Sequence, residues 1–116
     1  MQIEWSVFKV KEGKSQKVEE WLSFLQDNKE EVLLTLEQEK MYVEAIFRGQ
    51  EMQGEFLYWF SIQGKDGTPV EESAHYVDQV HLRYWEECID ESWPSTTMSP
   101  DVSMISPRVA EAMTKR

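Results

Sequence analysis

Strand-like patterns mark three segments of the chain, residues 2–10, 41–48 and 55–63. Side chains two apart in a strand share a face, and the first two segments repeat with this period. The third is dense in aromatic and β-branched residues, which favour strands. Because the loop at residues 49–54 is short and polar, we expect the second and third strands to form an antiparallel hairpin.

Helical periodicity follows the first strand and the hairpin. Apolar side chains in residues 15–27 recur at the i, i+3, i+4 and i+7 positions of an amphipathic helix. These side chains are Val18, Trp21, Leu22 and Leu25. The pattern restarts at Asn28, so a first helical layer bent or broken there and ending around Gln38 is expected. A long second helix is predicted from Val70 to about Asp90.

The last part of the chain, residues 91–116, is predicted to be less regular. Residues 92–100 carry two prolines and are interpreted as irregular. Residues 101–105 supply a short last strand, and Ser106–Pro107 begins a short tail helix with proline at the first helical position. With 116 residues, the chain is expected to form one domain spanning 1–116.

The resulting element order predicts an α+β fold of the ferredoxin-like, split βαβ (βαββαβ) type. Such a fold has a four-stranded antiparallel sheet with both helices on one face, here followed by a short C-terminal helix. Neither side of the predicted strands is polar, since Phe8 and Val10 fall on one side and Trp5 and Val7 on the other. An apolar face of this size needs a cover, so we expect a homodimer through the sheet face. The alternative is a monomer whose tail, residues 92–116, covers that face.

The element order, the Trp-rich strands and the two-sided apolar sheet resemble the dimeric α/β-barrel superfamily. That superfamily includes cofactor-free monooxygenases, haem-degrading enzymes and muconolactone-type isomerases. Four segments resemble, more specifically, a family of short bacterial and archaeal proteins with no assigned activity. These segments are residues 30–33, 41–47, 57–59 and 81–89. No Asn/Trp/His set matches the superfamily's oxygenases position by position, so the resemblance carries over no catalytic residue and implies no cofactor.

The charge balance makes several classes of partner unfavourable. The chain has 22 Asp and Glu against 12 Lys and Arg, a net charge of −10. This disfavours nucleic acids and anionic membrane surfaces, which bind basic patches. No membrane-spanning run or signal peptide is evident, so a cytoplasmic location is expected. The single cysteine, Cys88, excludes an internal disulfide, and no Cys/His cluster suits zinc.

Candidate chemistry centres on His81, which falls on the apolar side of the predicted second helix. Asp78 precedes it by three residues and could fix its tautomer. His81 is then either a general acid or base lining a pocket, or a buried neutral imidazole with a structural role. Burial would lower its pKa and Asp78 would raise it, which leaves the direction open. His75 lies roughly 120° around the helix from His81, so no metal site is expected.

Glu44 and Arg48 share one side of the second strand with apolar residues. They form either a rim salt bridge across a dimer interface or the polar floor of a pocket with Tyr58 or Trp59 as its wall. Two functions therefore stay open. One is a small-molecule-binding or cofactor-free, enzyme-like protein, and the other is a non-enzymatic dimeric sensing or interaction module with a filled barrel. The candidate catalytic residues are His81, Glu44 and Tyr58, and the candidate ligand-binding residues are Trp59, Arg48, Trp85 and Asp78.

Overall fold

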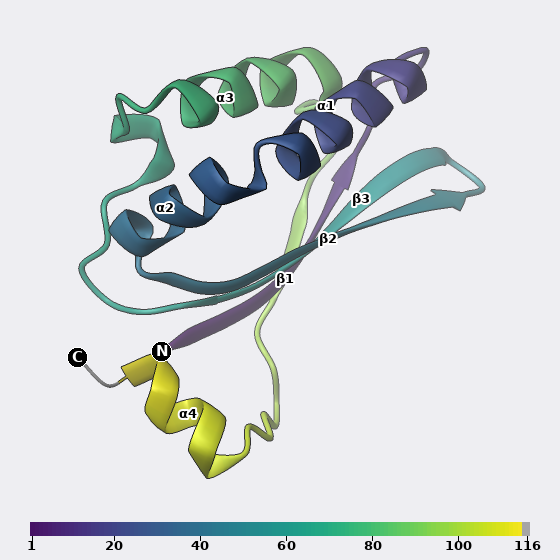
Figure 1. Ribbon diagram of the computed structural model, residues 1–116. Helices are drawn as coiled ribbons and strands as arrows, with labels where there is room; N and C mark the ends of the chain where they lie inside the picture. The colour runs from purple at the N-terminus through teal and green to yellow at the C-terminus, as the bar shows by residue number, and fades with distance from the viewer. Residues whose placement is uncertain (115–116) are drawn as a thin grey trace.

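Three long strands and one short strand form an antiparallel sheet, and four α-helices pack around it (Figure 1). The computed structural model describes residues 1–114. The elements are β1 (Gln2–Lys9), α1 (Ser15–Asp27), α2 (Lys29–Glu39), β2 (Met41–Glu51), β3 (Gly54–Gln63), the 3₁₀ helix η1 (Val70–Glu72), α3 (Tyr76–Cys88), β4 (Thr96–Met98) and α4 (Pro107–Thr114). The strand order across the sheet is β2-β3-β1-β4. The mixed α+β class and the β2–β3 hairpin are therefore confirmed.

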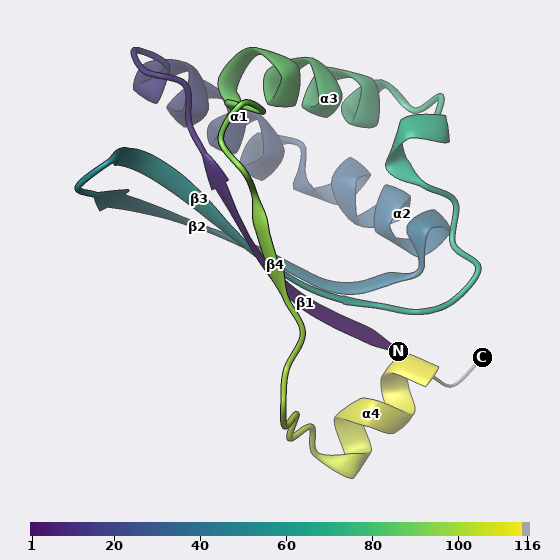
Figure 2. The ribbon, with the colours of Figure 1, turned by 180° about the vertical axis from the view of Figure 1, so that it is seen from behind.

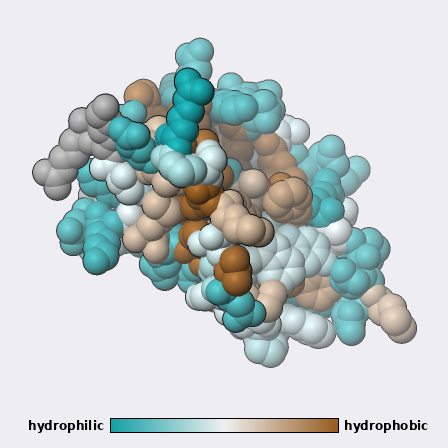
Figure 3. All heavy atoms as spheres, turned by 90° about the horizontal axis from the view of Figure 1, so that it is seen from below, coloured by the Kyte–Doolittle hydropathy of each residue, from teal (hydrophilic) through white to brown (hydrophobic). Residues whose placement is uncertain are grey.

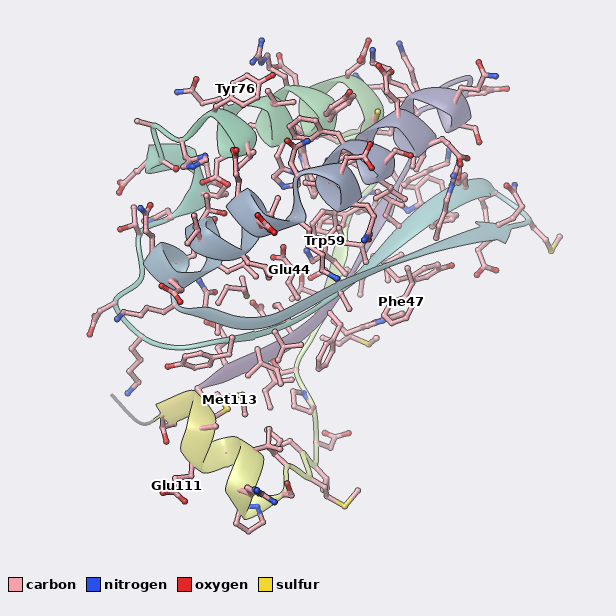
Figure 4. All side chains as sticks on the ribbon, viewed as in Figure 1. Glu44, Phe47, Trp59, Tyr76, Glu111 and Met113 are labelled. Carbon is pink, nitrogen blue, oxygen red and sulfur yellow. The ribbon has the colours of Figure 1, made fainter. Side chains whose placement is uncertain are left out.

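The sheet has one face toward α1, α2 and α3, while α4 lies on the opposite side (Figures 1 and 2). Directly paired residues share a face, and Phe8 pairs with Leu57 while Glu44 pairs with Ser61. Phe8 contacts rings of the helical layer, so this set of positions faces the helices. The neighbouring positions in each strand, including Phe47, face the other way (Figure 4).

The core lies between the helices and this face of the sheet. Its buried members are Val10, Val18, Trp21, Leu57, Cys88 and Ile89. Trp21 is fully buried and lies close to the rings of Trp59, Tyr84 and Trp85. Burying several large rings in one cluster supplies much of the hydrophobic stabilisation available to a chain of this size.

The predicted interruption of the first helical layer at Asn28 is confirmed, because α1 ends at Asp27 and α2 begins at Lys29. The Asn28 side chain donates a hydrogen bond to the Phe24 carbonyl oxygen, 2.9 Å away, instead of capping α2. Asparagine competes with the helix for backbone partners in this way, which accounts for the break.

The single long helix predicted from Val70 to Asp90 is wrong. The chain forms η1, then an extended segment at residues 73–75, and α3 starts only at Tyr76. The Ser73 hydroxyl accepts a hydrogen bond from the His75 backbone N–H, and His75 Nδ1 accepts one from the Val77 N–H. Both local bonds favour a turn and a new helix start over a continuous helix. His75 is thus the N-cap residue of α3.

The last strand also lies elsewhere than predicted. β4 is formed by residues 96–98, which pair with residues 5–7 of β1, and residues 101–105 form no strand. Thr97 is β-branched, and its hydroxyl lies 2.9 Å from that of Ser6, which ties β4 to the sheet edge. The predicted tail helix is confirmed as α4, from which Met113 points toward the sheet and Glu111 away from it (Figure 4).

Much of the sheet face on the α4 side stays open. Apolar surface gathers there beside a hydrophilic border (Figure 3). Phe47 is 56% exposed, and Val43 is also exposed. None of the helices within residues 1–114 is long and apolar enough to cross a membrane.

Candidate functional site

A cavity of about 600 Å³ lies between α2, α3 and the helix-facing side of β2. Its walls are partly apolar, with side chains from α1, α2, β2 and α3. The main apolar contributors are Leu22, Leu25, Val32, Leu36, Ile46 and Val77. Four carboxylates and one imidazole line the same space, those of Glu39, Glu44, Glu71, Asp78 and His81. Apolar walls with a few polar groups are typical of small-molecule sites.

Each polar group reaches the cavity for a local reason. Asp78 and His81 lie on α3 at i and i+3, so they share one side of the helix. Glu44 points from β2 into the space between sheet and helices, as does Trp59 from β3 (Figure 4). Glu39 is the last residue of α2, where Lys40 adopts the left-handed conformation and turns the chain into β2.

The loop after β3 closes over the end of α2. The Thr68 backbone N–H donates a hydrogen bond to the Gln38 carbonyl oxygen, and the Gln63 side chain donates one to the Glu39 carbonyl oxygen. A Cβ at Gly67 would collide with that same Glu39 carbonyl group, so only glycine permits this close approach. The loop thereby holds Glu39 against the cavity.

Trp21 determines the tautomer of His81. Its indole Nε1–H donates a hydrogen bond to His81 Nδ1 over 2.9 Å. An indole N–H can only donate, so Nδ1 accepts and the neutral imidazole carries its proton on Nε2. The role predicted for Asp78, fixing this tautomer, therefore belongs to Trp21. Burial lowers the pKa of His81 to about 4 despite the opposing effect of Asp78, so the imidazole is neutral at pH 7.

The two glutamates are both harder to ionise than usual. Burial raises the pKa of Glu39 to about 7, with further contributions from Asp78, Glu44 and Glu71. Burial also raises the pKa of Glu44, although a hydrogen bond from Trp59 acts in the opposite direction. A carboxyl group that titrates near neutral pH can give or take a proton under ordinary conditions.

Asp78 has an unmet hydrogen-bonding requirement. Its side chain is only 6% exposed, and its Oδ2 atom has no hydrogen-bond partner among the described residues. A buried acceptor without a donor costs free energy that a bound donor would recover. Across residues 1–114, no group of three or more His, Cys, Asp or Glu side chains has an arrangement that could hold a metal ion.

The remaining sequence candidates lie away from the cavity. Tyr58 is on the opposite sheet face, stacked on Trp5 with ring centroids 5.5 Å apart, and its hydroxyl donates to Glu51. Adjacent strand residues point to opposite faces, so Tyr58 and Trp59 cannot both line one pocket. Tyr58 is therefore not brought together with His81 and Glu44.

Arg48 and Trp85 serve packing at the other end of the helical layer. Arg48 pairs with Glu19 and Glu55 within the chain, not at a pocket floor. Trp85 lies edge-on to Phe8, with centroids 4.6 Å apart, in the aromatic core. Neither lines the cavity. Trp59 contributes indirectly, through its hydrogen bond to Glu44 and its ring 5.7 Å from that of His81.

Sequence reasoning did not single out Glu39 or the role of Trp21. Glu39 follows Val32 and Leu36 at the i, i+4 and i+7 positions of α2, so the helical pattern places it on their side of the helix. That spacing was the available signal. The helical spacing places Trp21 on the apolar side of α1, but nothing in the sequence indicates a bond to a residue 60 positions away.

Comparison with protein families gives a match over nearly the whole chain. The model of DUF6176, a family of unknown function, matches residues 1–111. The protein belongs to DUF6176. No curated protein matches it. Membership in DUF6176 names no activity, so the chemistry of the cavity has to carry any functional conclusion for this member.

Proposed function

We propose that this DUF6176 protein binds a small organic molecule in the cavity between α2, α3 and β2. The supporting observation is the convergence of Glu39, Glu44, Asp78 and His81 on one partly apolar space of about 600 Å³. That volume falls within the range of ordinary ligand sites. The unsatisfied Oδ2 atom of Asp78 offers a defined acceptor for the ligand.

The same groups could support enzyme-like proton transfer without a cofactor. Glu39, with its pKa near 7, would exchange a proton with the ligand, and His81 would offer its Nε2–H as a hydrogen-bond donor. Glu44, held by Trp59, would orient the ligand. Binding is the minimal proposal, and turnover is its extension.

We further infer a ferredoxin-like sheet that dimerises through its open face. The strand order β2-β3-β1-β4 and the exposure of Phe47 support this. Light scattering tests it, with a dimer expected for the wild type. Phe47→Lys should produce monomers, whereas Met52→Lys, at the fully exposed hairpin turn, should not. A wild-type monomer would instead favour the tail as the only cover of this face.

A fragment screen by ligand-observed NMR tests the binding site. Leu33 and Leu34 are neighbours on α2 and are 50% and 62% exposed, but only Leu33 lines the cavity. Leu33→Trp should block the cavity and abolish fragment binding, whereas Leu34→Trp should leave it intact. If no fragment binds, or if both variants bind like the wild type, the site is wrong. The non-enzymatic dimeric module then becomes the better description.

A further inference from the structure

Among residues 1–114, the acids that line the cavity form no ion pair with a cation. Every charged group that acts on Glu39, namely Asp78, Glu44 and Glu71, carries the same sign as Glu39 and raises its pKa. Glu44 likewise has Asp78 as its charged neighbour, and its hydrogen-bond donor, Trp59, is neutral. His81 is neutral at pH 7 and provides no positive charge. Lys29 lines the cavity but forms no ion pair with these acids.

Asp78 adds a second observation that is independent of this charge count. Its carboxylate is more than nine-tenths buried, lines the cavity and has an oxygen atom without a donor. Buried carboxylates in folded proteins are normally paired with a cation or fully hydrogen-bonded. A donor group with a positive charge would satisfy this oxygen atom and also offset the like charges around it.

The walls indicate what such a group is attached to. Side chains of Leu22, Val32 and Ile46 face the same space. A hydrated ion would leave this apolar surface in contact with water, whereas an organic ligand would bury it. A bare metal ion also lacks a suitable ligand set among residues 1–114. We propose that the cavity binds a small protonated organic amine, with its ammonium group on Asp78 and Glu44 and its apolar body against α1 and α2. This inference rests on the binding function proposed above and names its ligand class.

Three probes that share a phenyl ring and differ in charge test which ligand charge the cavity prefers. These are 2-phenylethylamine, 2-phenylethanol and phenylacetate, titrated into the full chain by calorimetry at pH 7.5. The amine should bind at least about tenfold more tightly than the alcohol, and phenylacetate should not bind. Proton release should accompany amine binding at pH 6.5, because a cation favours the ionised form of Glu39.

Matched variants locate the binding. Asp78→Asn should weaken amine binding by about tenfold or more while leaving alcohol binding within about twofold. Asp101→Asn makes the same change in net charge on the exposed tail and should have no effect. Circular dichroism verifies that both variants fold. Equal effects of the two substitutions would mean general charge attraction and would overturn the proposal.

The outcomes distinguish the ligand class from the site itself. If the alcohol or phenylacetate binds as tightly as the amine and Leu33→Trp blocks it, the cationic class is wrong but the cavity remains a binding site. If the fragment screen finds ligands and the amine at about 10 mM does not bind, the same conclusion holds. If neither the fragments nor the probes bind, the proposed function fails as well.

Discussion

The two ends of the layer between helices and sheet are built in opposite ways. At the α1 end, rings pack closely around Trp21, and Arg48 pairs with both Glu19 and Glu55. At the α2 end there is a cavity, and Glu39 and Asp78 form no ion pair there among the described residues, although Lys29 lines the same cavity. One sheet thus carries an aromatic end, where acids are paired with Arg48, and an acidic end, where the carboxylates that line a cavity form no ion pair among the described residues.

This difference distinguishes residues that stabilise the fold from residues that are expected to have a function. Dense packing and paired charges lower the free energy of the folded chain, whereas buried, mutually repelling carboxylates raise it. Residues that break the local rules for stability are expected at functional sites. The acidic end is therefore where a ligand is expected, and the aromatic end is its support.

The largest expected effect on stability comes from truncating Trp21, the buried ring at the centre of the aromatic end. Trp21→Ala should lower the free energy of unfolding by about 3–5 kcal/mol, because a fully buried ring leaves a cavity and His81 loses its hydrogen bond. Leu33→Ala, at the mouth of the existing cavity, should cost less than about 1 kcal/mol. Urea denaturation measures both. Similar losses for the two variants would contradict the contrast between the ends.

Much of this contrast follows from patterns readable in the sequence. The period of β2 places Glu44 on the side of Ile46, and the helical spacing in α1 puts Trp21 in the core. The sequence does not show which side of β3 faces the helices, because aromatic rings occupy successive positions. The alternation of side chains therefore cannot decide between Tyr58 and Trp59. Only pairing with β1 decides this, and it puts Trp59 opposite Ser6 on the helix-facing side.

Other features depend on contacts that no local pattern encodes. The polar stretch at the end of α2 suggests an exposed helix end, yet the loop at Gly67 covers Glu39 there. The direction of the His81 pKa shift was open because two effects compete, and the burial imposed by the folded chain decides it. The position of β4 was missed because a three-residue edge strand has too short a pattern to detect.

The second largest effect is a pH-dependent stabilisation by Glu39→Gln. In the wild type the folded state binds the Glu39 proton more tightly than the unfolded state, since the pKa rises from 4.5 to about 7. Stability from this group is therefore greatest below about pH 4.5 and is lost as the pH rises to 7. The variant should match the wild type near pH 4.5 and exceed it by on the order of 2 kcal/mol at pH 8.

Denaturation curves at several pH values test this, with Glu39→Asp as a control that keeps an acid at the site. Asp78, Glu44 and Glu71 face Glu39 and stay in place in both variants. A constant difference between wild type and Glu39→Gln across this range would show that Glu39 is not perturbed, and the acidic end would lose its distinguishing property.

A smaller effect is expected where the acids already have a cation. Arg48→Gln should destabilise the protein by about 1 kcal/mol, because Glu19 and Glu55 lose their shared partner at a partly exposed site. The loss should shrink at high salt, which screens surface charges. An unchanged stability at low salt would show that charge pairing contributes nothing at the α1 end.

The smallest effect comes from adding a cation to the acidic end. Leu33→Lys places an ammonium group at the mouth of the cavity, whereas Leu34→Lys places one on the adjacent position outside it. The first variant should be more stable than the second by about 0.5 kcal/mol, since its charge opposes those of Glu39 and Asp78. It should also lower the pKa of Glu39 and weaken amine binding, because the lysine competes for the same carboxylates. Carboxyl NMR titration and calorimetry measure these changes. Equal stability, Glu39 pKa and amine affinity in the two variants would show that the cavity favours a positive charge no more than the adjacent surface does.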